Sequence, residues 1–341
     1  MGVCREWRLR AVPRGVLAAD DLALADVALP QPAAGEVRLR VLRLPMDPAI
    51  RMTLASRGGN YGAGVAVGSA VRGLVLGRVE ASRSPALAVG DIVSGFGSWS
   101  EQIVGDAARF APVSVRADLP LSIHTHVLGT SGLAALHGLA DVGAVRSGDS
   151  VLVSAAAGGV GSLACQFARL LGASRVVGIA GGAEKCRIAV ERYGCDACID
   201  HRAAPDLEAA LRAALPEGVD LGFENVGGAP LQAALALLRP GARIALCGMI
   251  AEYDAAEPAP GPANLWNLIV QRARIEGFRV APLLADRPRV DALLERIEGW
   301  LRAGTLQYDI DERDGFEAVP QAFAALSNGG HRGRLVVRVA D

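Results

Sequence analysis

A glycine-rich stretch, VLVSAAAGGVGS at residues 151–162, has the composition most directly suited to chemistry. It joins an apolar, strand-like run to a helix-compatible run, LACQFARLLGA. Gly158 and Gly161 occupy the second and third glycine positions of the pattern G-x-G-x-x-G, and Ala156 takes the first. In such a turn, small residues let a diphosphate reach backbone N–H groups at the start of the helix. A tight turn that only packs a helix on a sheet can have the same composition.

About twenty residues after the glycine loop, NAD-binding chains offer an Asp or Glu to the adenosine ribose. Here the second strand ends with Gly181 and Gly182, and Lys185 follows. The next strand ends in Asp-His-Arg, which adds His201 and Arg202. Cations without a carboxylate at the tip fit a ribose that carries a 2′-phosphate, so the sequence predicts NADPH as the cofactor. The alternative is that Lys185 is a solvated lysine in a first helical turn.

The elements that must position these residues follow from the hydrophobic pattern after residue 126. Strand candidates recur every twenty-odd residues, with helical patterns between most of them: SVLVSAA, RVVGIA, ACID, DLGFENVG, GARIALCG and RIEGFRV. Two of the helical patterns, at 160–171 and 289–303, carry apolar residues at the spacing of one helix face. Alternating strands and helices predict an α/β fold with a parallel, doubly wound sheet.

The region from about 36 to 115 has a different pattern. EVRLRVLRL alternates arginine with apolar residues, as a half-buried strand does. Clusters of Gly, Pro and Ser then separate GLVLGRVEAS, GDIVSGF and SEQIVGD. This pattern predicts a small, largely antiparallel β domain, to which the final segment GRLVVRVA returns. The length of 341 residues is typical of about two domains.

Composition excludes several classes of protein. Lys plus Arg (35) nearly balance Asp plus Glu (36), so no basic field favours nucleic-acid binding. No stretch reaches the roughly 18 apolar residues of a membrane span, and the N-terminal MGVCREWRLR has no apolar core like that of a signal peptide. Six cysteines in such a chain indicate reduced thiols and a cytoplasmic protein. The single C-x-x-C of Cys195 and Cys198 favours packing over zinc binding.

Taken in order along the chain, eight segments resemble the zinc-independent medium-chain dehydrogenases/reductases. They are most similar to the branch of prostaglandin reductases, 2-alkenal reductases and NADPH-dependent curcumin reductases. The segments are DPAIRM (47–52), LGTSGLAAL (128–136), AAAGGVGS (155–162), GGAEKC (181–186), DLGFENVGG (220–228), CGMIAEY (247–253), IEGFRV (275–280) and GFEAVPQAF (315–323).

The resemblance implies a GroES-like, partly open β-barrel domain at 1–125 and 308–341, which holds the substrate. It implies a Rossmann domain at 126–307, which binds NADPH, and a homodimer joined through the edges of the Rossmann sheets. Carried over by position, the cofactor-binding residues are Gly158, Gly159, Val160, Gly161, Lys185, His201, Asn225, Cys247, Gly248, Met249, Ile250, Tyr253, Phe278, Arg279, Val280 and His331. His331 stands where relatives usually have Asn.

The implied reaction delivers a hydride from NADPH to the β-carbon of an α,β-unsaturated carbonyl compound. No Gly-His-Glu and no four-cysteine lobe occur in the sequence, so we expect no metal site. An enolate then needs a hydrogen-bond donor, and its α-carbon needs a proton. By resemblance, Tyr253 and Tyr61 are the candidate catalytic residues, and Arg51, Tyr61 and Arg279 are candidate substrate residues. Arg51 has the alternative of structural pairing near the barrel.

The sequence departs from the family where Ala49, Ala134 and Leu136 replace residues with hydroxyl groups. One interpretation is a pocket retuned for a larger or acidic substrate, with Arg279 as an anion anchor. In the other, Arg279 points to solvent, and the nearby His124 and His126 are surface residues.

Three other functions are alternatives to the reductase. The lost hydroxyl groups leave open a catalytically silent NADPH-binding protein or partner subunit. A methyltransferase would need an acidic residue at the tip, where Gly181 and Gly182 lie. A serine hydrolase is disfavoured because no G-x-S-x-G occurs.

Overall fold

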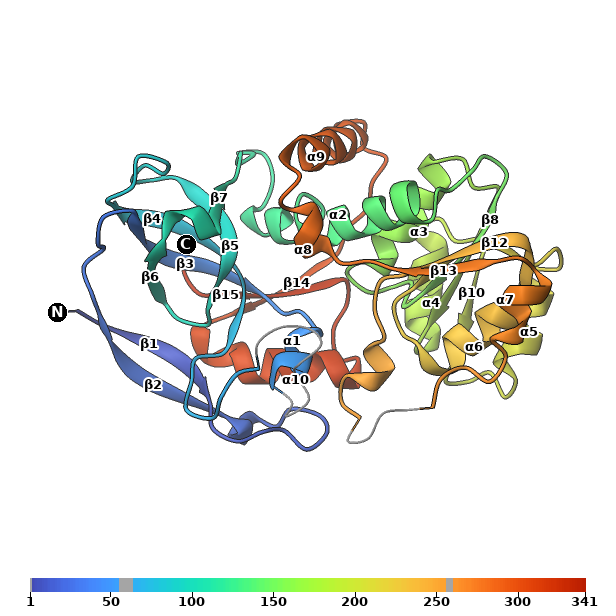
Figure 1. Ribbon diagram of the computed structural model, residues 1–341, viewed down its shortest axis with the longest axis horizontal. Coiled ribbons are helices and arrows are strands. Elements are labelled where there is room, and N and C mark those ends of the chain that lie inside the picture. The colour runs from blue at the N-terminus through green and yellow to red at the C-terminus, as the bar shows by residue number, and fades with distance from the viewer. Residues whose placement is uncertain (1, 55–63, 256–259) are drawn as a thin grey trace. The chain divides into compact units, whose positions relative to one another are not determined.

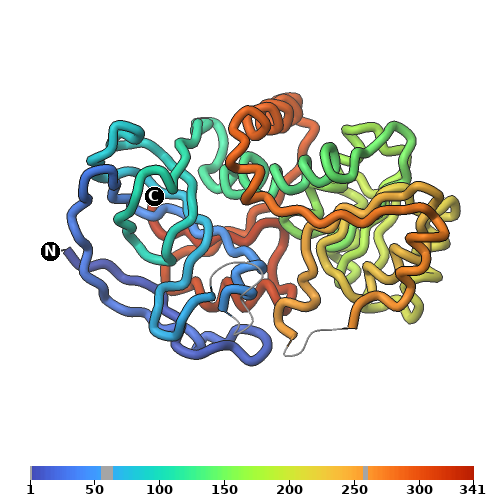
Figure 2. The backbone as a smooth tube through the Cα atoms, viewed as in Figure 1, coloured from blue at the N-terminus to red at the C-terminus, as the bar shows by residue number. Residues whose placement is uncertain are grey.

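The computed structural model describes residues 2–54, 64–255 and 260–341 (Figure 1). The chain forms two compact units. One consists of Met1–Thr125 and Ile310–Asp341, and the other of His126–Asp309. The red C-terminal segment joins the blue N-terminal strands in the first unit (Figure 2), where β15 (Arg334–Arg338) pairs antiparallel with β3 (Glu36–Pro45). The predicted return of the last strand to the first domain is therefore confirmed.

The first unit is built on a seven-stranded sheet of order β14-β15-β3-β4-β5-β7, with β6 also paired to β3. Its pairs are antiparallel except β14 with β15, which confirms the largely antiparallel domain. A separate antiparallel pair, β1 with β2, was not predicted. The remaining strands are β1 (Gly2–Leu9), β2 (Leu22–Leu29), β4 (Arg72–Ser82), β5 (Ile92–Ser98), β6 (Gln102–Asp106), β7 (Phe110–Pro112) and β14 (Ile310–Asp314).

Two α-helices of the first unit pack around this sheet's core. They are α1 (Ile50–Leu54) and α10 (Val319–Asn328). Phe323 of α10 lies edge-on to the fully buried Trp99, with 5.5 Å between ring centroids. Burial of two aromatic side chains with this geometry makes the helix part of the core.

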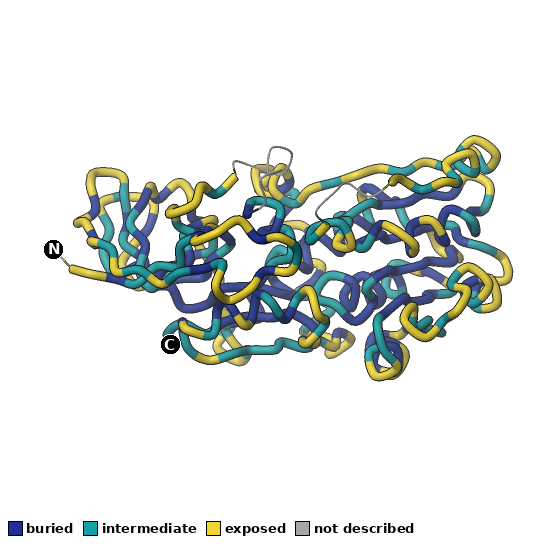
Figure 3. The backbone as a smooth tube through the Cα atoms, turned by 90° about the horizontal axis from the view of Figure 1, so that it is seen from below, coloured by how far each residue is buried: buried dark blue, intermediate teal, exposed yellow. Residues whose placement is uncertain are grey.

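The second unit has a six-stranded sheet of order β10-β9-β8-β11-β12-β13, parallel throughout. Its strands are β8 (Ser150–Ser154), β9 (Arg175–Ala180), β10 (Ala197–Asp200), β11 (Val219–Glu224), β12 (Leu238–Leu246) and β13 (Arg274–Gly277). Buried residues form long continuous stretches in Figure 3, and all five residues of β8 are buried. The predicted doubly wound α/β fold is confirmed.

Helices precede, join and follow the strands of this sheet. They are α2 (Thr130–His137), α3 (Gly161–Leu170), α4 (Ala183–Glu191), α5 (Leu207–Ala214), α6 (Gly228–Ala236), α7 (Trp266–Val270), α8 (Val280–Leu283) and α9 (Arg287–Arg302). The apolar face predicted for α3 is buried. Helix α9 begins two residues before its predicted start, because Asp286 caps the N–H of Arg289.

The strand order reverses between β8 and β11, which are neighbours in space but not in sequence. In open α/β sheets, ligands bind outside the carboxyl ends of the strands at such a switch point. A ligand site is therefore expected at the loops that follow β8, β9, β11 and β12.

Candidate functional site

The loop between β8 and α3 has a backbone that larger side chains would disrupt. Ala155 has a φ of 52°, in the left-handed region. The Gly158 N–H donates to the Ala155 carbonyl oxygen at 2.9 Å. A Cβ on Gly161 would lie 2.1 Å from that oxygen, and one on Gly158 would lie 3.2 Å from it. The loop thus folds back on Ala155, and Gly161 in particular has no room for a side chain.

The same loop presents backbone donors. Within the described residues, the N–H groups of Gly159, Val160 and Gly161 donate to no backbone acceptor. They lie where the ten-residue helix α3 begins. Unsatisfied N–H groups and the positive end of the helix dipole favour an anion there. The residues present therefore fit a diphosphate.

Positive charge gathers beside the end of the next strand, β9. A Cβ on Gly181 would lie 2.9 Å from Arg202 Nε and 3.0 Å from His201 Nε2. The absence of a side chain at Gly181 is what lets both groups approach the strand tip. Lys185 is half-buried on α4. Burial, and then the charge of Arg202, lower the pKa of Lys185, so these two cations belong to one electrostatic cluster.

A carboxylate holds this turn in place. Asp200 Oδ1 accepts hydrogen bonds from the N–H of Gly182 at 2.8 Å and from the N–H of Arg202 at 3.0 Å. These bonds lower the pKa of Asp200. The Asp200 carboxylate is thus bound to backbone N–H groups. The basic side chains at this strand end, Lys185, His201 and Arg202, are the groups suited to binding an anion.

Across the switch point, β11 ends in a buried polar network. Glu224 Oε1 accepts hydrogen bonds from Ser154 Oγ at 2.8 Å, from the Val226 N–H at 2.6 Å and from the Gly227 N–H at 2.8 Å. Asn225 donates its N–H to Ser154 Oγ and its side-chain amide to the Ser154 carbonyl, both at 2.7 Å. The predicted residue Asn225 is therefore fixed against β8.

Sequence reasoning missed the roles of Ser154 and Glu224. Glu224 is 3% exposed, and its position as an acid directly after the apolar run Leu-Gly-Phe (221–223) was an available signal.

The turn after β12 is attached to this network through its backbone. The N–H groups of Cys247 and Gly248 donate to the Glu224 carbonyl at 2.8 Å and 3.2 Å. The Ile250 N–H donates to the Asn225 carbonyl at 3.1 Å. The structure thus brings the predicted segment 247–250 together with Asn225.

Tyr253 closes the same turn. It is half-buried, and the Met249 N–H lies 3.4 Å from Tyr253 Oη. A Cβ on Gly248 would lie 3.1 Å from that oxygen, so the hydroxyl lies directly over the backbone of the segment. The other predicted tyrosine, Tyr61, lies outside the described residues.

The segment after β13 contributes an aromatic ring. Phe278 lies edge-on to His137, with 5.6 Å between ring centroids, and to Phe223 at 6.2 Å. A Cβ on Gly138 would lie 2.5 Å from the Phe278 ring. Arg279, which follows, is exposed, and Val280 begins α8.

Two of the residues predicted from the sequence, Arg51 and His331, belong to the first unit. Arg51 is buried, and its guanidinium donates to the carbonyls of Pro13 and Gly15 at 2.6 to 3.1 Å. These contacts favour the structural interpretation of Arg51. His331 Nδ1 lies 3.2 Å from the Ala325 carbonyl.

His124 and His126 are 5% and 0% exposed. Their interpretation as surface residues is therefore wrong, because both side chains are buried.

Two family models match the sequence. One is described as the N-terminal domain of oxidoreductase and matches residues 5–113; the other is described as zinc-binding dehydrogenase and matches residues 159–298. The chain is 35% identical over 340 residues to the NADPH-dependent curcumin reductase of Escherichia coli (strain K12), covering 98% of this chain and 97% of that protein. The chain belongs to the zinc-independent medium-chain dehydrogenases/reductases.

A further relative and a solved structure support the same family assignment. The NADP(+)-dependent 2-alkenal reductase of Nicotiana tabacum is 36% identical over 307 residues, covering 90% of this chain and 88% of that one. The crystal structure of CurA in complex with NADPH from Vibrio vulnificus superposes with a TM-score of 0.91 at 34% identity, covering 99% of each chain. The resemblance found in the sequence motifs is confirmed.

The second family model is described as a zinc-binding dehydrogenase. In residues 2–54, 64–255 and 260–341, no three His, Cys, Asp or Glu side chains gather where they could hold a metal ion. No helix in those ranges is long and apolar enough to cross a membrane. Independence from metal stays a prediction for this member of the family.

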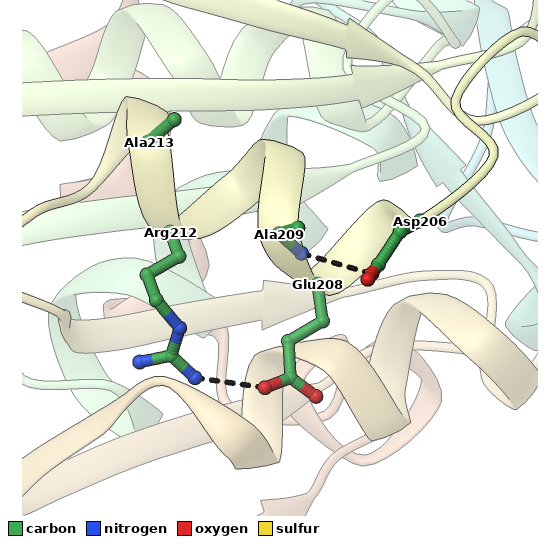
Figure 4. A pocket seen from close by; sticks show the side chains of 5 residues that line it. All are labelled: Asp206, Glu208, Ala209, Arg212 and Ala213. Atoms are coloured by element: carbon green, nitrogen blue, oxygen red, sulfur yellow. Dashed lines mark hydrogen bonds and ion pairs between the residues drawn. The ribbon is translucent and has the colours of Figure 1, made fainter.

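A surface hollow lies on α5 (Figure 4). It is lined by Asp206, Glu208, Ala209, Arg212 and Ala213. Asp206 caps the helix through the Ala209 N–H at 3.0 Å, and Glu208 pairs with Arg212 at 2.7 Å. These polar groups already satisfy one another, so the hollow is a feature of the helix surface.

Proposed function

We propose that this chain is an NADPH-dependent reductase of the C=C bond of α,β-unsaturated carbonyl compounds. The observation that carries the proposal is the pairing of two features on neighbouring strands. One is the set of unused backbone donors at the start of α3, and the other is the cationic tip beside Gly181. Relatives that cover almost the whole chain are NADPH-dependent reductases by name, which supports the same cofactor here.

The first half of the sheet holds the adenosine end of NADPH. Gly158, Gly159, Val160 and Gly161 meet the diphosphate, because α3 directs its first N–H groups toward it. Lys185 and His201 meet the 2′-phosphate. A phosphate prefers such cations to a carboxylate because charge-assisted hydrogen bonds are about twice as strong as neutral ones.

The second half holds the ribose and nicotinamide. The residues proposed for this part are Asn225, Cys247, Gly248, Met249, Ile250, Tyr253, Phe278, Arg279 and Val280. His331, at the position where relatives usually have Asn, is proposed as a further cofactor residue.

The chemistry that bound NADPH supplies is donation of a hydride to the substrate's β-carbon. The negative charge that develops on the substrate oxygen then needs a hydrogen-bond donor, and the α-carbon needs a proton. Tyr253 Oη is the proposed donor, with Tyr61 as the second candidate. Arg279, being exposed, is proposed to hold an acidic substrate. Arg51 has its guanidinium bound to backbone carbonyls, so it supports the fold of its unit.

The loss of NADPH absorbance with a panel of enones and enals tests this function, with the matching saturated ketones as controls. Turnover of the unsaturated compounds alone supports the proposal. If NADPH binds but no compound is reduced, the chain is instead a silent NADPH-binding protein. If NADPH does not bind, the cofactor assignment itself is wrong.

We also propose that the chain forms a homodimer through the edge of its parallel sheet. Strand β13 is an edge strand, and the adjoining α7 region exposes Leu265, Trp266, Ile269 and Val270 at 49% to 69%. Unpaired strand edges and exposed apolar side chains favour association. Light scattering gives the mass in solution, and a monomer at micromolar concentration would contradict the dimer. No disulfide joins the six cysteines, all of which lie in the described residues, and this supports the proposed cytoplasmic location.

A further inference from the structure

Glu224 is a buried acid that the proposed reaction does not use. It ends β11, and Ser154, which ends the neighbouring strand β8, donates its hydroxyl to it at 2.8 Å. The two residues therefore face each other across the switch point of the sheet. Dinucleotides cross the sheet at this point.

The hydrogen bonds of this carboxylate are uneven. Oε1 accepts from Ser154 Oγ and from the N–H groups of Val226 and Gly227, whereas within the described ranges Oε2 accepts no hydrogen bond. A glutamine could present its amide oxygen to the same three donors. The network by itself therefore does not require a charged side chain.

A charge at this position is costly. Burial raises the pKa of Glu224, and the hydrogen bonds from Gly227, Val226 and Ser154 oppose that rise. A buried carboxylate disfavours folding unless something else compensates it. A ligand that carries positive charge in one of its states would supply such compensation.

We propose that the Glu224 carboxylate makes the site prefer the oxidised, positively charged nicotinamide ring over the neutral reduced ring. The inference rests on the proposed use of NADPH. The cations beside Gly181 assign the β8–β10 half of the sheet to the adenosine 2′-phosphate, so the β11–β13 half takes the nicotinamide. Glu224 ends the first strand of that half, and its charge acts strongly because it is removed from water.

The electrostatic role can be separated from a structural one by measuring two dissociation constants. Glu224→Gln keeps the acceptor for the three donors and removes the charge. We expect the Kd of NADP⁺ to rise about tenfold relative to that of NADPH, as expected for one nearby charge. The Kd of NADPH should change less than about twofold on the same reasoning. Both constants are obtained by titration of intrinsic and cofactor fluorescence.

Two further variants make the result decisive. Glu224→Asp keeps the charge but shortens the side chain, so the two constants should rise together and their ratio should stay as in the wild type. Asp220→Asn removes a charge near the start of the same strand, where Asp220 accepts from the Ser150 N–H at 2.9 Å and pairs with Arg239. The ratio of the Kd of NADP⁺ to the Kd of NADPH in Asp220→Asn should equal that of the wild type.

An unchanged ratio in Glu224→Gln, or equal weakening of both cofactors, overturns the inference and leaves Glu224 as a structural residue. If Glu224→Gln does not fold, as judged by its thermal melting curve, a changed ratio in Glu224→Asp overturns it and a retained ratio supports it. A wild type that binds neither NADP⁺ nor NADPH contradicts the proposed function itself. The two failures are therefore distinguishable.

Discussion

The two halves of the parallel sheet use polar side chains in opposite ways. Beyond β9 and β10, His201 and Arg202 are exposed and Lys185 is half-buried. In the other half, Glu224 at the end of β11 is buried, and its carboxylate accepts hydrogen bonds from Ser154 at the end of β8 and from the Gly227 N–H.

Exposed cations add little to folding, because water screens them and solvates them well in either state. They remain available to choose between ligands. A buried polar group must be satisfied within the protein, so the second network fixes the geometry of its loops. We therefore expect that the choice between NADPH and NADH lies in the first half, and that the second half fixes the geometry of the loops that follow β11 and β12.

The largest expected effect tests the second half. Tyr253→Phe removes a hydroxyl and keeps the ring, so we expect kcat on an enone to fall about 10–1000-fold, the range for a lost acid or oxyanion donor. The Kd of NADPH should change little, because the contact between Tyr253 Oη and the Met249 N–H is long at 3.4 Å. Steady-state kinetics and cofactor titration measure the two quantities. If Tyr253→Phe has the kcat of the wild type, another residue donates the proton, and Tyr61 is the next candidate to test.

The next effect tests the first half. Lys185→Ala should weaken NADPH binding about 10–150-fold, since a hydrogen bond to a charged group contributes roughly 1.5–3 kcal/mol. Lys185→Glu should weaken it further by placing a carboxylate against the phosphate. NADH, which has no 2′-phosphate, should be nearly unaffected.

Arg187→Ala is the matched control for Lys185. Arg187 lies two residues further along α4 and pairs there with Glu191, so its loss should leave both cofactors unchanged. Equal weakening of NADH and NADPH by Lys185→Ala would show that Lys185 supports the fold. A wild type that prefers NADH would contradict the cofactor assignment.

A smaller effect concerns the loop between β8 and α3. Gly161→Ala places a Cβ 2.1 Å from a backbone carbonyl oxygen, and such overpacking costs about 1–3 kcal/mol of stability. Gly299 lies within α9, and a Cβ there meets nothing within 4 Å. Gly299→Ala should therefore stabilise the protein by about 0.5–1 kcal/mol. Urea unfolding measures both variants, and equal midpoints would contradict the steric account.

The last prediction is that removal of metal ions has no effect on activity. Dialysis against a strong chelator should leave turnover unchanged, because the described residues contain no cluster able to hold a metal ion. Activity that is lost on dialysis and restored by zinc would contradict this expectation.

The amino-acid sequence was sufficient for features that depend on short-range order. The strands of the parallel sheet and the buried face of α3 follow from local hydrophobic periodicity. The requirement for small residues at 158 and 161 follows from the turn between a strand and a helix. The cations at Lys185, His201 and Arg202 were visible because they follow two successive strand ends.

Other features were decided only by tertiary structure. Strands β1 and β2 gain their regularity by pairing with each other, and neither was predicted. The burial of His124, His126 and Arg51 depends on which surfaces pack over them. Glu224 and Ser154 are 70 residues apart, and no local pattern relates them. They meet because a crossover places β11 beside β8, and the sheet then removes both side chains from water.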